Sequence, residues 1–181
     1  MSITINGNGT ITGYEPVANG SITTAKLADG AATQAKRTYA TGEIIQVKYK
    51  KSADGQHSSA SAGGNGADVS GYTDSISLTS SSNNTLIILS LNPYLGGSSD
   101  VRYALKLFRD TTMIYEDTWL AARSGESKAF RSSHIFLDTG VSDTNSHTYK
   151  VALKKESGSD SIYLMDEGLN AHTMTLMEIA A

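Results

Sequence analysis

Large apolar side chains recur at every second position over short segments of this chain from residue 42 to the C-terminus. Tyr103, Leu105 and Leu107 show this spacing, as do Tyr149, Val151 and Leu153. Successive side chains of a β-strand point to opposite faces, so the spacing predicts strands that each bury one face. Turn residues separate the segments, and none has a ten-residue helical period. The expected strands are 43–50, 74–80, 84–95, 101–110, 112–120, 134–140, 147–157, 161–168 and 172–180.

About nine short antiparallel strands in some 140 residues predict an all-β fold, a β-sandwich with a jelly roll as the leading topology. The stretch KSADGQHSSASAGGNGADVSG, residues 51–71, is rich in Gly and Ser and is expected to be a long loop. We therefore assign residues 42–181 to a sandwich head.

Residues 1–41 contain few large side chains and are expected to form an extended attachment arm. Ordering one residue costs roughly 1–2 kcal/mol, and burying one large aliphatic side chain returns roughly 1.5–3 kcal/mol, so this segment cannot order itself as a monomer. Its opening, ITINGNGTITG, predicts a small hairpin with an Asn-Gly turn. Ile3, Ile5 and Ile11 are the candidate anchor to a larger particle.

A ten-residue near-repeat occupies the second half of this arm. Gly20, Thr23, Ala25 and Lys26 recur as Gly30, Thr33, Ala35 and Lys36. Its large aliphatic residues are Ile22 and Leu27, and its small residues would let several backbones approach one axis closely. We interpret the repeat as a short stalk in which Ile22 and Leu27 contact their counterparts in other copies.

No pattern of residues predicts catalysis, a metal or a cofactor. The chain has no cysteine, and His57, His134, His147 and His172 lack the spacing of a ligand pair. The pairs Glu116-Asp117 and Asp166-Glu167 would each divide between two faces of a strand. We therefore expect a protein that is not an enzyme and binds no cofactor.

Charge and hydropathy also exclude several partners. A net charge of -3 predicts no nucleic-acid binding, and the lysines at 48, 50 and 51 are expected on a solvated strand face. The longest aliphatic run, residues 86–91, is too short to cross a bilayer, so no membrane insertion is expected. The first ten residues, MSITINGNGT, do not resemble a signal peptide.

The order of these parts resembles short tail fibres and other virion fibre proteins of tailed, cyanophage-like bacteriophages. INGNGTITG followed by GSITTAKLADGAATQAK is similar to the stalk repeats before fibre heads. TGEIIQVKYKKSADGQHSSAS with GYTDSISLTSSSNNTLIILSLN is similar to the opening of a head, and IFLDTGVSDTNSHTYKVALKKESGSDSIYLMDEG with HTMTLMEIAA to its end. The stalk here has only two repeats, where long tail fibres have many.

The resemblance implies a homotrimeric virion protein, assembled in the host bacterial cytoplasm. Its arm would attach to other virion proteins of the tail, baseplate or capsid. Its jelly-roll head, similar to C1q and tumour-necrosis-factor heads, would present loops to a host glycan or other receptor. The expected tip loops are 51–70, 95–100 and 120–128, and the candidate receptor-facing residues are Tyr94, Trp119 and Arg123.

Several alternatives stay open at this point. The same trimer could be a capsid decoration or capsid fibre protein, or a baseplate appendage, with a structural role. A depolymerase head and a stand-alone lectin-like module are further readings. The aromatic residues Tyr94, Tyr103, Tyr115 and Trp119 could also belong to the core or to an oligomer interface.

Overall fold

The computed structural model describes residues 4–5, 11–12, 38–52, 57–58, 64–96, 101–122, 128–129, 131–158, 161–164 and 172–181. The chain divides into two units, Met1–Thr38 and Tyr39–Ala181. The division comes slightly before the boundary that composition placed after residue 41, because Tyr39–Glu43 belongs with the head.

The first unit contains one described hairpin. β1 (Thr4–Ile5) pairs antiparallel with β2 (Ile11–Thr12), with Ile5 opposite Ile11. The Asn-Gly turn signal lies between these two strands, as the sequence predicts.

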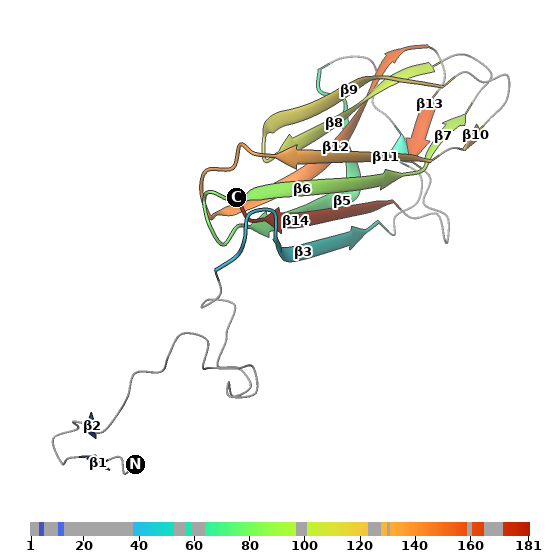
Figure 1. Cartoon of the computed structure of the whole chain (residues 1–181). Coiled ribbons are helices and arrows are strands. Elements are labelled where there is room, and N and C mark those ends of the chain that lie inside the picture. Colours follow the sequence, from blue (N-terminus) through green and yellow to red (C-terminus); the bar gives the residue numbers. More distant parts are fainter. Residues whose placement is uncertain are drawn as a thin grey trace. The chain divides into compact units, whose positions relative to one another are not determined.

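The head is built from three antiparallel sheets, so the all-β class is confirmed (Figure 1). We call the first main sheet the terminal sheet: β11 (Ser132–Asp138), β6 (Asn84–Leu91), β14 (Thr173–Ile179) and β3 (Ile44–Lys51), in that order. The second, the opposing sheet, has the order β5 (Ala67–Ser77), β12 (Ser146–Ser157), β8 (Val101–Arg109) and β9 (Thr112–Ala122). A smaller sheet joins β10 (Lys128–Ala129), β7 (Pro93–Gly96), β13 (Ser161–Leu164) and β4 (His57–Ser58).

Strand pairing in the two main sheets is nested. β8 pairs with β9, β6 with β11, β5 with β12 and β3 with β14, each pair enclosing the previous one along the sequence. The chain therefore passes repeatedly from one sheet to the other, and the first and last strands of the head lie side by side.

The core fills the space between the two main sheets. Both sheets contribute alternate residues to it, as period two predicts. Its buried members are Val69, Tyr72, Ile76, Ile87, Leu89, Leu91, Tyr103, Leu105, Leu107, Tyr149, Val151, Leu153, Met174 and Leu176.

The expected loop at 51–71 is wrong at its C-terminal end. β5 begins at Ala67, and Val69 is buried in the core. Gly71 has φ +70°, and the register against β12 shifts between Lys150 and Ala152, opposite this point. An irregularity at Gly71 therefore hides the alternation of β5 in the sequence.

The expected strand at 84–95 is in fact two strands. It is interrupted at Asn92, whose backbone N–H donates to His172 Nδ1 at 3.0 Å. β6 ends before this residue, and β7 begins after it and joins the small sheet. β4 and β10 were not expected, because two residues are too few for a periodicity.

Candidate functional site

The strand connections give the head two different ends. At one end the connections are 78–83, 110–111 and 139–145, and the head's first and last residues lie there too. We call this the short-turn end. The opposite, long-loop end carries 52–66, 92–100, 123–131 and 158–172, which contain the four strands of the small sheet. Of the three tip loops expected from the sequence, 51–70, 95–100 and 120–128, large parts lie outside the described residues; the parts that are described lie at or beside this end.

The chain enters the head beside its own C-terminus. Gly42 N donates to Ala180 O at 2.8 Å, and Ala180 N donates to Glu43 O at 2.9 Å. These bonds fix the start of the head to the last strand at the short-turn end.

A buried carboxylate reinforces this junction. Glu178 on β14 is fully buried, and its oxygens accept hydrogen bonds from Gln46 Nε2 (2.7 Å), Asn83 Nδ2 (2.6 Å), and both Thr79 N and Thr79 Oγ1 (2.7 Å each). Burial alone would raise the pKa of Glu178, but the donors of Asn83, Thr79 and Gln46 together outweigh it and lower the pKa. Glu178 therefore links β3, β14 and the 78–83 turn as a stabilised anion.

A second buried carboxylate joins the two main sheets at the same end. Asp138, the last residue of β11, accepts Arg109 Nη1 on both oxygens at 2.8 and 2.7 Å. Tyr149 OH donates to Asp138 Oδ2 at 2.8 Å, and Gly140 N donates to Oδ1 at 2.9 Å. Asp138 thus clamps the terminal sheet to β8 and β12 of the opposing sheet.

His147 forms a third polar cluster near these turns. Its Nδ1 lies 2.8 Å from Asp110 Oδ2, and its Nε2 lies 3.0 Å from Asp143 Oδ1. The hydrogen bond to Asp110 is the main cause that raises the pKa of His147, and the pKa of both Asp110 and Asp143 is lowered. The cluster connects the β8–β9 turn to the start of β12.

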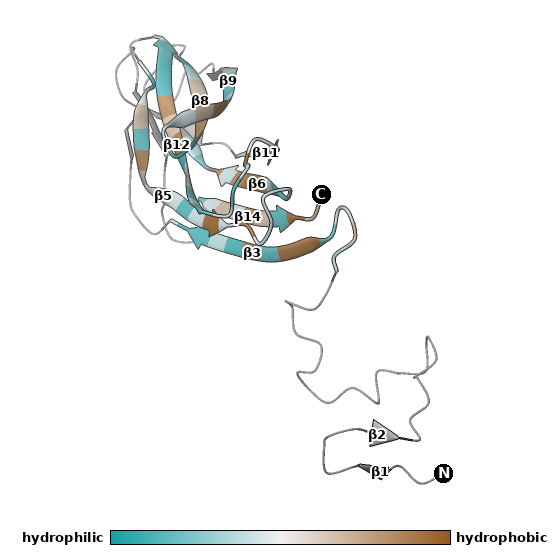
Figure 2. Cartoon of the chain, turned by 90° about the vertical axis from the view of Figure 1, so that its left-hand side faces the viewer, coloured by the Kyte–Doolittle hydropathy of each residue, from teal (hydrophilic) through white to brown (hydrophobic). Residues whose placement is uncertain are grey.

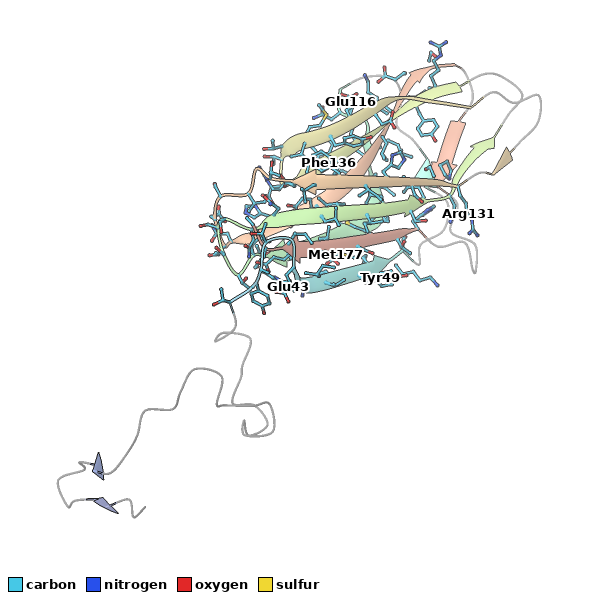
Figure 3. All side chains as sticks on the ribbon, in the orientation of Figure 1. Glu43, Tyr49, Glu116, Arg131, Phe136 and Met177 are labelled. Atoms are coloured by element: carbon cyan, nitrogen blue, oxygen red, sulfur yellow. The ribbon has the colours of Figure 1, made fainter. Side chains whose placement is uncertain are left out.

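Outward-pointing apolar residues cover the terminal sheet. Strand register aligns Leu137, Leu86, Met177 and Val47 in one row across β11, β6, β14 and β3. The next row is Ile135, Ile88, Thr175 and Tyr49, and Ile179 lies opposite Ile44 near the short-turn end. We call these the apolar face: Ile44, Val47, Tyr49, Leu86, Ile88, Ile135, Leu137, Met177 and Ile179. Figure 3 labels Tyr49 and Met177 on this sheet.

The apolar face is exposed in the single chain. The side chains of Ile135 and Tyr49 are 69% and 63% exposed, and those of Ile44, Val47 and Leu137 are also exposed. Lys51, at the end of β3, is the one charged residue at an outward position of these four strands, all of which are described. The sheet thus places carboxylates at 138 and 178 among apolar core residues on its inner side, whereas its outer face is also apolar.

The outer face of the opposing sheet carries paired charges. Lys106 Nζ lies 3.5 Å from Glu116 Oε1, and Lys150 Nζ lies 2.7 Å from Asp68 Oδ2. Lys154 and Glu156 form a further ion pair at 2.8 Å. The apolar residues Ala104, Phe108 and Ala152 of this outer face are buried, whereas five residues of the apolar face are exposed.

Half of the candidate site residues proposed from sequence lie in described parts of the chain. Ile5 and Ile11 face each other in the β1–β2 pairing, whereas Ile3, Ile22, Leu27 and Arg123 lie outside the described residues. Tyr94 is in β7, opposite Tyr163, and Trp119 is in β9 near its long-loop end.

The other two aromatic candidates have structural roles. Tyr103 is buried in the core, and the Tyr115 ring packs 5.3 Å from the Phe136 ring. The lysines at 48, 50 and 51 are exposed, as expected, but divide between the two faces of β3. The apolar face itself was missed.

Carboxylates on β9 separate as the strand period predicts. Glu116 lies beside Lys106, whereas Asp117 Oδ2 is 3.8 Å from His134 Nδ1 on β11. Burial lowers the pKa of His134. Asp166 and Glu167 lie outside the described residues. Within the described ranges, no cluster of three or more His, Cys, Asp or Glu could hold a metal ion. The described part also has no helix that is long and apolar enough to cross a membrane.

Comparison with known proteins adds only distant likenesses. No family model and no curated protein matches the sequence. Dimeric latent PorU from Porphyromonas gingivalis is similar in structure, with TM-score 0.45 and 11% identity over 78% of this chain and 13% of that one. Infectious bursal disease virus, Gt strain, gives TM-score 0.41 and 12% identity over 78% and 39%. The chain thus spans well under two thirds of each, and such likenesses say nothing of activity or partners.

Proposed function

We propose that this chain is a virion structural protein of the fibre type. Three copies would associate, the arm would attach to the tail, and the head would present its long-loop end to the host surface. The observation that carries the proposal is the polarity of the head: the chain enters among the short turns, and the long connections gather at the opposite end. In a head that is anchored at the short-turn end, the long loops lie away from the anchor. Loops vary more than the strands that they connect and often carry binding residues.

The nested pairing of the main strands supports the finer description of the head. A jelly roll of the C1q and tumour-necrosis-factor type would have its first and last strands adjacent in one sheet, as β3 and β14 are here. The sequence resemblance of the arm and head to phage fibres points in the same direction.

A panel of immobilised bacterial surface polysaccharides, probed with the full chain, tests receptor presentation. We expect binding to one polysaccharide class that is lost when residues 95–100 are replaced by Gly and Ser, or on Tyr94→Ala. Replacing Thr111 in the β8–β9 turn by Ser, at the other end, should leave binding intact. Absence of binding, or binding unaffected by changes at the long-loop end, would overturn this part of the proposal.

Position on the particle separates the fibre from its structural alternatives. Immunogold labelling of virions that contain the protein should mark the tail. Label spread over the shell would instead support a capsid decoration or capsid fibre protein, and label at the baseplate an appendage.

A further inference from the structure

We infer that the apolar face is where copies of this chain pack together, in a closed ring of three with parallel heads. This inference deepens the proposed function, because it names the surface through which the fibre protein meets itself. It rests on the proposed function for the number three, and on the described residues for the surface.

Exposure of the apolar face to water is energetically unfavourable. Monomeric proteins rarely expose a continuous apolar patch across a whole sheet, and such patches mark interaction sites. Burying apolar area contributes about 25 cal/mol per Å², so leaving Ile135 and Tyr49 in water forgoes a large gain. The two rows run from β11 to β3; one is apolar throughout, and the other contains Thr175 on β14.

The position of the apolar face on the head indicates that another copy of the chain covers it. The apolar face reaches Ile44 and Ile179, next to the point where the chain enters the head and where it ends. Copies that pack through this face with parallel strands would therefore bring their residues 39–43 together. Such a meeting agrees with the sequence-based expectation that assembly orders the arm, because its few large side chains cannot order it alone.

The apolar face has two different sides through which the copies can meet. Val47 and Tyr49 lie on the β3 side of the apolar face, and Ile135 and Leu137 lie on its β11 side. Two different patches on opposite sides of one surface suit a head-to-tail contact, which forms a ring where the rotation between copies closes. Each copy would use its β3 side against the β11 side of the next.

Open-ended pairing along the strand edge is opposed by charge. Lys48 and Lys50 alternate with Val47 and Tyr49 along the exposed edge strand β3. Lysines on an edge strand disfavour edge-to-edge extension of a sheet. The apolar face is therefore available for packing, while the edge itself resists fibril-like growth. In Figure 2 the beginning of β3 is coloured hydrophobic and its end hydrophilic.

Substitution at the most exposed position tests the surface. We expect the full chain to have a mass near 57 kDa by light scattering, three times the 19.1 kDa of one chain. Ile135→Lys should reduce the mass to that of one chain, because each contact would bury an unpaired charge. The matched control is Met113→Lys, which changes an exposed apolar residue on β9 of the opposing sheet and should stay near 57 kDa. A trimeric Ile135→Lys variant would overturn the inference.

Cysteine cross-linking tests the ring even if that variant fails to fold. The natural chain has no cysteine, so introduced thiols are unique. In Tyr49→Cys/Ile135→Cys, two strands separate the thiols within one chain, and a short bis-maleimide should join different copies into a covalent trimer. Each single variant can give at most a dimer and serves as the control. A double variant that stops at dimers, or that forms a ladder beyond trimers, would overturn the closed ring.

These outcomes are distinguishable from failure of the proposed function. A trimer that binds no surface polysaccharide leaves the packing surface standing and overturns receptor presentation. A monomeric full chain that binds polysaccharide overturns the packing surface and the association of three copies, and leaves receptor presentation standing.

Discussion

At the scale of single residues, one sheet buries two carboxylates on its inner side and exposes apolar side chains on its outer face. Asp138 and Glu178 are buried, and each is held by several donors that compensate for the lost water. Ile135 is largely exposed on the opposite face. The buried anions stabilise the junction at the short-turn end, and the exposed isoleucine belongs to the surface that we propose as the contact between copies.

Replacing Glu178 by Gln should destabilise the head by about 3 kcal/mol, because a neutral amide leaves buried donors of Asn83, Thr79 and Gln46 poorly paired. Urea unfolding at fixed chain concentration, followed by the fluorescence of the single tryptophan, measures this loss. Since the folded pKa of Glu178 lies below its ordinary value of 4.5, its stabilisation is present above that pH and is lost as pH falls through the folded pKa. Glu156→Gln, at an exposed position, should change little; equal losses in both variants would contradict this role.

His147 should give stability a dependence on pH of the opposite sign. Its folded pKa lies above 6.5, so its contribution is complete below that pH and is lost as pH rises through the folded pKa. Asp110 and Asp143 contribute above 3.8 and lose that contribution as pH falls, so the cluster stabilises most between about pH 3.8 and 6.5. The Tm of the natural chain should be lower at pH 9 than at pH 5, and the His147→Gln variant should lack this decrease.

Low salt should enlarge that difference, because exposed ion pairs are screened. Buried His134 titrates with the opposite sign, since its pKa is lowered, but it is present in both chains and cancels in the comparison. Identical pH profiles for the two chains would show that the His147 cluster contributes nothing to stability.

At the scale of elements, the strands were largely predictable and the apolar face was not. Period two locates β8 and β12 because one face of each carries large core residues. β6 is different: Leu86 and Ile88 alternate with Ile87 and Leu89, so both of its faces are apolar. Such a strand predicts burial on both sides, and this signal in β6 could have indicated a second packing surface. β4 and β10 depend on tertiary pairing and leave no local signal.

The start of β5 depends on a glycine that packs against β12. Gly66 has φ +82°, and a Cβ there would lie 2.4 Å from Leu153 O and 2.6 Å from Leu153 C. Gly66→Ala should therefore cost about 3 kcal/mol, because both the backbone angle and the contact with β12 are strained. Gly64 has φ +57° but open space around the same position, so Gly64→Ala should cost only about 1 kcal/mol. Urea midpoints of the two variants measure the difference; equal midpoints would contradict the close approach of Gly66 to β12.

At the scale of the whole molecule, the head has an end that receives the chain, an end that gathers long connections, and an apolar face between them. The two ends follow from the order of the strands only once the sheet pairing is known, because the sequence alone did not assign the loops to either end. The apolar face does not follow from strand order. The apolar face places the self-association surface within residues 39–181. We therefore propose that the head drives the association of copies. The arm would then be an anchor that becomes ordered when the copies associate.

The most direct test is the solution mass, by light scattering, of the full chain and of a shortened chain beginning at Tyr39. If the apolar face drives assembly, the full chain has a mass near 57 kDa, three times 19.1 kDa, and the shortened chain also has three times its own mass. A shortened chain that is monomeric while the full chain is trimeric would assign assembly to the arm, and a monomeric full chain would contradict the account altogether.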